Sequence, residues 1–139
     1  MLRASAPLFL SLLLLASLAG CNTYREELLR TQHAFEMNQH ERTLGLLRDL
    51  EADVPRLSTP EQAQYAYLRG MTDYRMNHRD DARHWLSIAK AYEDVQPGLL
   101  PTDWKGRMKE ALDEMNGVVY DDGLTALATS RKPGEPSSK

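Results

Sequence analysis

The thiol of Cys21 is the side chain whose position in this sequence most clearly indicates chemistry. The chain has 139 residues and a single cysteine, so this thiol has no partner within the chain for a disulfide. Two small residues, Ala19 and Gly20, directly precede it. A cysteine thiolate is a nucleophile, and small neighbours let the backbone enter a narrow enzyme groove. The thiol is therefore a candidate for covalent modification.

The segment before Cys21 has the pattern of an export signal. Arg3 supplies a positive start, residues 8–15 are apolar apart from Ser11, and small residues lead up to the cysteine. A transmembrane helix needs about 20 apolar residues, so this run is too short to span a bilayer. We therefore expect residues 1–20 to be a signal peptide that is removed from the mature protein.

The run Leu18-Ala19-Gly20-Cys21 resembles the lipobox of bacterial lipoproteins. In that family a diacylglycerol is attached to the cysteine thiol, the chain is cleaved just before the cysteine, and the new amino group receives an acyl chain such as palmitate. The resemblance implies lipid on Cys21 and no other cofactor. The next residue is Asn22 rather than Asp, which in Gram-negative lipoproteins favours the periplasmic face of the outer membrane. The alternative is an ordinary signal peptide with an unrelated cysteine.

Charge and motif content argue against several classes of function. The chain has 17 basic and 20 acidic residues and a net charge of -3, whereas nucleic-acid binding needs a basic face that replaces counterions on phosphates. The sequence contains no nucleophile-elbow, phosphate-loop or dinucleotide motif, so we expect no enzyme. The four histidines, none in an HExxH or CxxC-type set, are not expected to bind a metal: His33, His40, His78 and His84. His40 and His78 lie in predicted turns and are expected to be solvated.

The elements that position these residues are predicted to be helices, because apolar residues beyond Cys21 recur at helical spacing and no segment alternates as a strand would. The expected fold class is all-α, with antiparallel helix pairs. One domain is expected over residues 21–128, followed by a disordered tail over 129–139 that is rich in Pro, Gly and Ser. The predicted helices cover residues 23–37, 41–53, 60–76, 79–94 and 103–115, with a short sixth near 121–129.

Local signals set the expected helix ends. Thr59 is predicted to be the N-cap of the third helix, with Pro60 at its first position and Gln62 completing a capping box. Pro55 is expected to end the second helix, because a proline disfavours the helical conformation of the residue before it. The pair Asn116-Gly117 is expected to stop the fifth helix.

Two predicted helix pairs correspond at a period of 39 residues when Asn38 is aligned with Asn77. The second pair, over residues 63–94, resembles the tetratricopeptide repeat (TPR). The residues that match the repeat are Gly70, Tyr74, Ala82, Leu86 and Ala89. Arg69 and Asp73 depart from it, because the family commonly has apolar or aromatic residues at their positions. The resemblance implies a TPR-like α-solenoid of about two repeats plus a C-terminal capping helix, and the alternative is a generic antiparallel helical bundle.

In that family the first helix of each pair lines a concave groove that receives a peptide or a partner helix. Carried onto this sequence, the partner-binding groove would be lined by Gln64, Tyr67, Met71, Tyr74 and Arg75. Tyr, Met and Arg are enriched at protein interfaces. The alternative is that aromatic residues of this set, Tyr74 above all, fill the core between helix pairs, as does Phe35 at the matching position of the first pair.

Together the lipobox and the repeat imply a membrane-anchored periplasmic lipoprotein that acts as a protein–protein interaction adaptor or as an assembly factor in an envelope complex. Its partners would be the membrane, through the lipid on Cys21, and a protein or peptide whose identity is open. One alternative is a purely structural subunit of an envelope or secretion complex, similar to a pilot lipoprotein. Another is a carrier of a small ligand.

Overall fold

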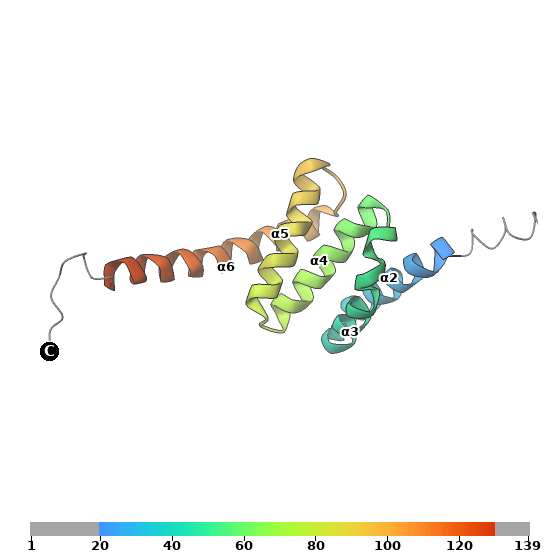
Figure 1. Cartoon of the computed structure of the whole chain (residues 1–139), viewed down its shortest axis with the longest axis horizontal. Helices are drawn as coiled ribbons and strands as arrows, with labels where there is room; N and C mark the ends of the chain where they lie inside the picture. Colours follow the sequence, from blue (N-terminus) through green and yellow to red (C-terminus); the bar gives the residue numbers. More distant parts are fainter. Residues whose placement is uncertain (1–19, 130–139) are drawn as a thin grey trace, which may run out of the picture.

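The computed structural model describes residues 20–129, and the side chains of residues 23–125 within that range. All the regular elements in this part of the chain are helices and none is a strand, which confirms the expected all-α class (Figure 1). The predicted signal, except Gly20, and residues 130–139 of the predicted tail lie outside the described residues. The elements are α2 (Gly20–Glu36), α3 (His40–Leu50), the 3-10 helix η1 (Glu51–Arg56), α4 (Thr59–Arg75), α5 (Arg79–Val95) and α6 (Thr102–Thr129).

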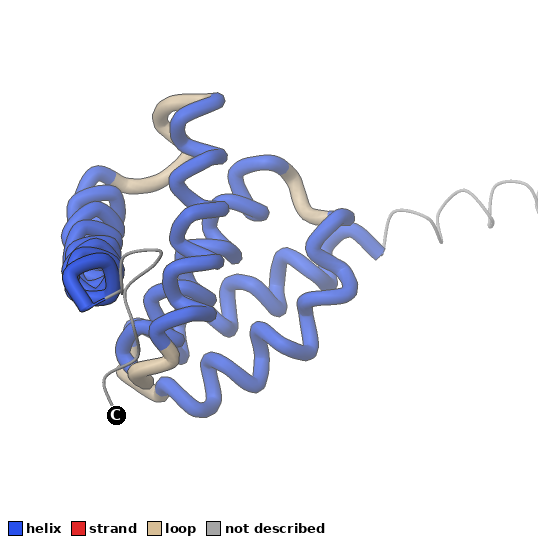
Figure 2. Tube along the Cα trace, turned by 60° about the vertical axis from the view of Figure 1, so that its left-hand side comes forward, coloured by secondary structure: helices blue, strands red, loops and turns tan. Residues whose placement is uncertain are grey.

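The helices pack in two antiparallel pairs, α2 with α3 and α4 with α5, and α6 lies against α4 and α5 (Figures 1 and 2). Helix α4 lies at the centre of the molecule, because ten of its residues, all between Ala63 and Asp73, are buried. Its buried tyrosine Tyr65 contacts the edge of Trp85 on α5 at 5.5 Å between ring centroids. The Tyr65 hydroxyl donates a hydrogen bond of 2.9 Å to the carbonyl of Leu47 on α3, so this one side chain ties three helices together.

The two short turns between paired helices have the same backbone geometry. Asn38 and Asn77 both adopt the left-handed conformation, with φ of 56° and 62°, which asparagine tolerates better than most residues. In each turn the asparagine N–H and the next N–H donate to carbonyls three and five residues earlier, the pattern of a Schellman helix end. The expected polar breaks are thus confirmed as helix ends, 39 residues apart.

Gly70 marks a close crossing of α4 and α5. A Cβ atom placed there would lie 2.6 Å from Cγ of Leu86 and 2.8 Å from the Leu86 backbone nitrogen. Distances under about 3 Å are closer than van der Waals contact allows. The absence of a side chain at this position is therefore what lets the two helix backbones approach.

The start of α4 differs from the prediction by one residue. Ser58, not Thr59, is the N-cap, Pro60 lies at the second helical position, and Glu61 rather than Gln62 completes the capping box. The Ser58 backbone N–H and hydroxyl both donate to Oε2 of Glu61, at 2.9 and 2.7 Å. A carboxylate accepts two such bonds and also favours the positive end of the helix. Gln62 instead donates to the Leu57 carbonyl at 2.8 Å.

Two further predicted helix ends were wrong. Helix α3 ends at Leu50, three residues early, and the chain continues as η1 with Pro55 inside it. Helix α6 runs without a break from Thr102 to Thr129, so Asn116-Gly117 does not stop it and there is no separate sixth helix over 121–129. A glycine inside a helix lowers its stability by about 1 kcal/mol. Helix α6 continues through Gly117 in spite of this cost.

Glu93 fastens the loop that leads from α5 to α6. Its two carboxylate oxygens accept hydrogen bonds from the backbone N–H groups of Gly98 at 2.7 Å and Leu100 at 3.0 Å. Lys105 lies 3.0 Å from the same carboxylate. The bonds from the Gly98 N–H, from Lys105 and from the Leu100 N–H lower the pKa of Glu93 to about 2, against partial desolvation.

This clamp predicts a specific acid sensitivity. Because the pKa of Glu93 is lower in the folded chain than its ordinary value of 4.5, its contribution to stability is complete above that value and is lost as the pH falls towards 2. We expect Glu93→Gln to lower the melting temperature at pH 7 and to reduce the fall in melting temperature between pH 5 and 2.5, followed by circular dichroism.

The neighbouring variant Asp94→Asn is the control, because Asp94 pairs only with Lys90 at an exposed position, where ion pairs contribute about 0–1 kcal/mol. An acid profile of Glu93→Gln that coincides with those of Asp94→Asn and the unsubstituted chain would contradict the clamp.

Candidate functional site

The residues expected to line a groove divide into two groups. Tyr67 and Met71 are in the core, with 0% and 5% of their surface exposed, so the structure does not place them at an open surface. The reason is α6: the ring of Trp104 stacks on Tyr67 with 4.3 Å between centroids and 12° between planes. The sequence alone did not indicate that the first turn of α6 would cover this part of α4.

The other three expected groove residues remain accessible and pair with neighbouring helices. Gln64 donates a hydrogen bond of 2.6 Å to Gln32 on α2. The Arg75 guanidinium lies over the ring of Phe35, 4.2 Å from its centroid. Phe35 itself is 3% exposed and belongs to the core. Gln64, the half-buried Tyr74 and Arg75 therefore form the rim of a surface whose centre is filled, and partner binding there stays a prediction.

Burial changes the acid–base behaviour of Tyr67, at the centre of this surface, and of Arg75, at its rim. Burial raises the pKa of Tyr67 to about 12, and it lowers the pKa of Arg75, an effect that Arg107 reinforces by charge repulsion. Within the described residues, the Tyr67 hydroxyl and Nη1 of Arg75 are buried without a hydrogen-bond partner. Tyr67 therefore stays neutral at physiological pH.

Asp73 is the centre of a buried ionic cluster. Its carboxylate is fully buried and lies 3.0 Å from Nε of Arg69 and 3.1 Å from Nδ1 of His78. Arg69, also buried, reaches Glu51 on η1 at 3.1 Å and lies over the Trp85 ring at 5.4 Å. Desolvation opposes the charged form of Arg69, but the bonds to Asp73 outweigh it, so the pKa of Arg69 is raised.

This cluster explains why Arg69 and Asp73 depart from the repeat pattern. The two residues are one helical turn apart and neutralise each other inside the space between α3, α4 and α5. His78 lies in the turn after α4, where its backbone N–H also donates to the Asp73 carbonyl at 2.8 Å. The pairs that Arg69 and Asp73 form with Glu51 and His78 link α4 to η1 and to the turn before α5.

The second half of α6, residues 116–129, projects beyond the rest of the molecule, and we call it the α6 arm (Figure 1). Every side chain described along it, over 116–125, is exposed. Large apolar residues are concentrated there: Val118, Val119, Tyr120 and Leu124 are 56%, 51%, 67% and 47% exposed. Contiguous exposed apolar surface often marks an interaction site, so the α6 arm is a candidate surface for a partner.

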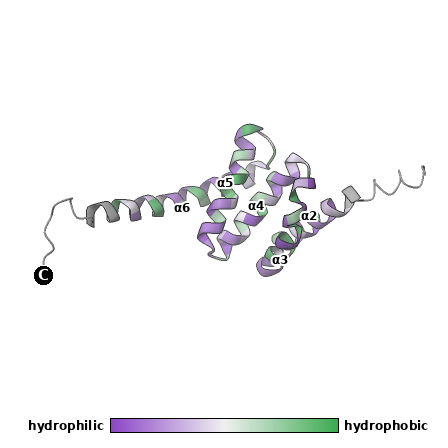
Figure 3. Ribbon diagram, viewed as in Figure 1, coloured by the Kyte–Doolittle hydropathy of each residue, from purple (hydrophilic) through white to green (hydrophobic). Residues whose placement is uncertain are grey.

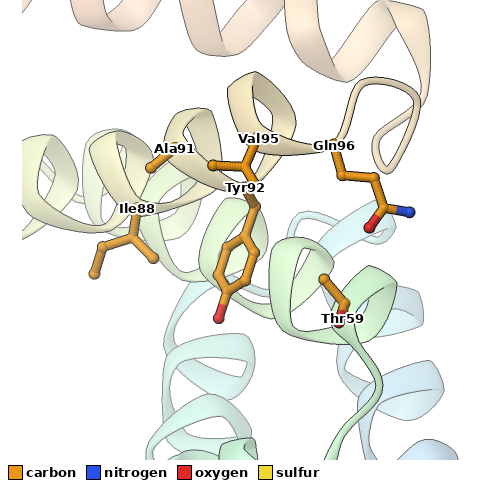
Figure 4. A pocket seen from close by; sticks show the side chains of 6 residues that line it. All are labelled: Thr59, Ile88, Ala91, Tyr92, Val95 and Gln96. Atoms are coloured by element: carbon orange, nitrogen blue, oxygen red, sulfur yellow. The ribbon is translucent and has the colours of Figure 1, made fainter.

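A shallow apolar hollow of about 390 Å³ lies on α5 beside the start of α4 (Figure 4). It carries no charged side chain, and Val95 at its edge is 87% exposed. The residues that line it are Thr59, Ile88, Ala91, Tyr92, Val95 and Gln96. Four of these follow one another at helical spacing along α5, so the hollow is part of an apolar stripe.

Comparison of the chain with family models, with curated proteins and with solved structures finds no match in any of the three. Over residues 20–129, no helix combines the length and the apolar character needed to cross a membrane. The side chains described there also form no cluster of His, Cys, Asp and Glu suited to a metal ion. Among the described residues, the α6 arm and the α5 hollow are the two candidate surfaces that the geometry offers.

Proposed function

We propose that this chain is a lipid-anchored, TPR-like protein of the bacterial envelope that binds a partner protein through the α6 arm. The lipobox-like run that ends at Cys21 supports the anchor. The single observation that supports the adaptor role is the concentration of exposed apolar side chains on a helix that projects from the folded body. In place of the expected groove, whose central residues are buried, the arm is the surface that we propose for the partner.

The arrangement of the two features favours an adaptor. The first turns of α2, which carry Cys21, and the α6 arm lie at opposite ends of the long axis of the molecule (Figure 1). At 1.5 Å per residue, the 14 residues of the arm extend for about 20 Å. An anchor at one end and an apolar helix at the other would hold a partner away from the bilayer. The arm has Asp121 and Asp122 and no basic residue, so the partner surface should combine apolar and basic side chains.

The proposed lipid anchor is tested by a substitution that removes the sulfur of Cys21. We expect Cys21→Ser to abolish fatty-acid labelling and to move the protein from the membrane to the soluble fraction, because two acyl chains account for stable anchoring. Metabolic labelling with palmitate and membrane fractionation measure the two effects. Ala19→Asp, which introduces a charged side chain beside the cleavage position, should block processing while leaving the thiol in place. Unchanged labelling and fractionation of Cys21→Ser would contradict the anchor.

The adaptor role is tested by site-specific photo-crosslinking in cells. A photoreactive residue at Tyr120 should give a defined adduct, because exposed aromatic residues are enriched among those that carry interface energy. Glu110, on the exposed side of the same helix where it packs on the body, is the matched control position. Leu124→Asp, combined with the probe at Tyr120, should reduce the adduct about tenfold or more, as loss of an interface anchor does. Equal adducts from the two positions, or none from the arm, would contradict the proposal.

A further inference from the structure

One end of the helical body gathers the chain segments nearest to Cys21. Arg25 on α2 lies 3.4 Å from Glu61 in the first turn of α4. On the other side of the same α4 turn, the hydroxyl of Tyr92 in the last turns of α5 donates to Gln62 at 2.6 Å. The first turns of α2 and α4 and the last turn of α5 therefore share one end of the body, which we call the anchor end.

The anchor end carries the apolar hollow and the most exposed large apolar residue described, Val95. Ile88, Ala91, Tyr92 and Val95 follow the i, i+3, i+4, i+7 spacing of one helix face. In Figure 3 the end of α5 shows a hydrophobic patch beside hydrophilic residues. We call the surface formed by these four residues, Thr59 and Gln96 the α5 tip surface.

The opposite end of α5 is polar. Its first turn contains Arg79, Asp80 and Asp81, all exposed, and the side chain of Asp80 is 94% exposed. The turns at Asn38 and Asn77 lie at that end as well. The first turn of α5 therefore has charged side chains throughout, whereas its last turn, at the anchor end, combines the exposed Val95 with the exposed Asp94.

We propose that the α5 tip surface lies against the same lipid bilayer that receives the acyl chains of Cys21. This inference rests on the lipid anchor proposed above. Cys21 precedes Arg25 by only four residues of continuous helix, which is about 6 Å of helical rise. So short a tether holds the anchor end at the headgroups, where an uncharged apolar surface gains free energy by entering the interface to a depth of about 5–10 Å.

The geometry favours the bilayer over a second copy of the chain as the occupant. A surface built on six residues and a shallow hollow is far smaller than the area of about 800 Å² per partner that a stable protein interface needs. Contact with a bilayer does not need so large an area, because the lipidated cysteine already supplies the affinity for the membrane. The α5 tip surface then only sets the orientation of the protein on it. The α6 arm is left free to point away from the membrane.

The experiment uses the unique cysteine of the chain. In the lipidated full-length protein the Cys21 sulfur is blocked, so Val95→Cys and Asp80→Cys each provide a single thiol for an environment-sensitive NBD label. Both positions are exposed and lie on the same helix, about 22 Å apart at 1.5 Å per residue. The proteins are reconstituted into phosphatidylcholine and phosphatidylglycerol vesicles, with and without phosphatidylcholine brominated on its acyl chains, and NBD emission is recorded.

We expect bromolipid to quench NBD at position 95 roughly twofold, with a blue shift, and to leave position 80 unchanged, since the quencher acts only within the apolar interface. Equal quenching at the two positions, or none at position 95, would overturn the proposed orientation. Flotation of the same vesicles separates the two proposals. If the protein floats with the vesicles and the Cys21→Ser control does not, the lipid anchor is supported, whatever NBD emission is recorded at position 95. Protection of position 95 without bromolipid quenching would assign the surface to a protein and also overturn the bilayer proposal.

Discussion

Asp73→Ala should destabilise the fold by about 3–5 kcal/mol, because removing one partner of a buried ion pair leaves the other charge uncompensated. Arg69 would keep only Glu51, whose side chain is half exposed, and His78 would lose its side-chain partner. Small domains have total stabilities of about 5–15 kcal/mol, so the loss is a large share of the total. The urea midpoint, followed by circular dichroism at pH 7, measures it.

Two comparisons distinguish loss of the charge pair from loss of a side chain. Asp80→Ala removes an exposed carboxylate that pairs with Arg83 on the same helix, and we expect a change within about 0.5 kcal/mol. The double variant Arg69→Met with Asp73→Leu replaces the buried pair by apolar side chains, which is often neutral or stabilising. We therefore expect the double variant to recover most of the stability that Asp73→Ala loses. A loss in Asp73→Ala no larger than that in Asp80→Ala would contradict the role of the cluster.

The predictable parts of the fold are those that depend on local sequence. Asn38 and Asn77 stood at polar breaks in the apolar pattern, and both are left-handed helix ends. Gly70 and Leu86 were among the residues that match the repeat, and Leu86 is too near Gly70 for a Cβ atom. In these cases the residues that give the sequence pattern also form the structural feature, so the feature can be predicted without knowledge of distant contacts.

The errors occurred where distant segments decide the outcome. Apolar spacing places Tyr67 and Met71 on one face of α4, but only the packing of α6 decides whether that face is open or covered. The i, i+4 spacing of Arg69 and Asp73 was visible, yet Glu51, which completes the cluster, lies 18 residues before Arg69. The stop expected at Asn116-Gly117 is a different error, because α6 continues through both residues without a left-handed conformation.

Gly70→Ala should destabilise the chain by about 1–3 kcal/mol, the usual cost of overpacking a close contact. The added methyl group would lie 2.6 Å from Cγ, 2.7 Å from Cδ2 and 2.8 Å from the backbone nitrogen of Leu86. The side chain could rotate away, but the backbone nitrogen could move only with helix α5. The gain of up to about 1 kcal/mol from replacing glycine inside a helix is too small to offset this separation of the two helices.

The sign of the effect distinguishes close packing from helix propensity. Gly45 and Gly106 also lie in helices, but a Cβ at either meets no atom within 4 Å, so Gly45→Ala and Gly106→Ala should each stabilise by up to about 1 kcal/mol. Adding Leu86→Ala to Gly70→Ala removes two of the three clashing atoms and leaves the backbone nitrogen, so a double-mutant cycle should show favourable coupling but incomplete rescue. If Gly70→Ala raised the urea midpoint as the two controls should, that result would contradict the close approach of α4 and α5 at Gly70. The packing that places the α5 tip surface beside the first turn of α4 would then need a different explanation.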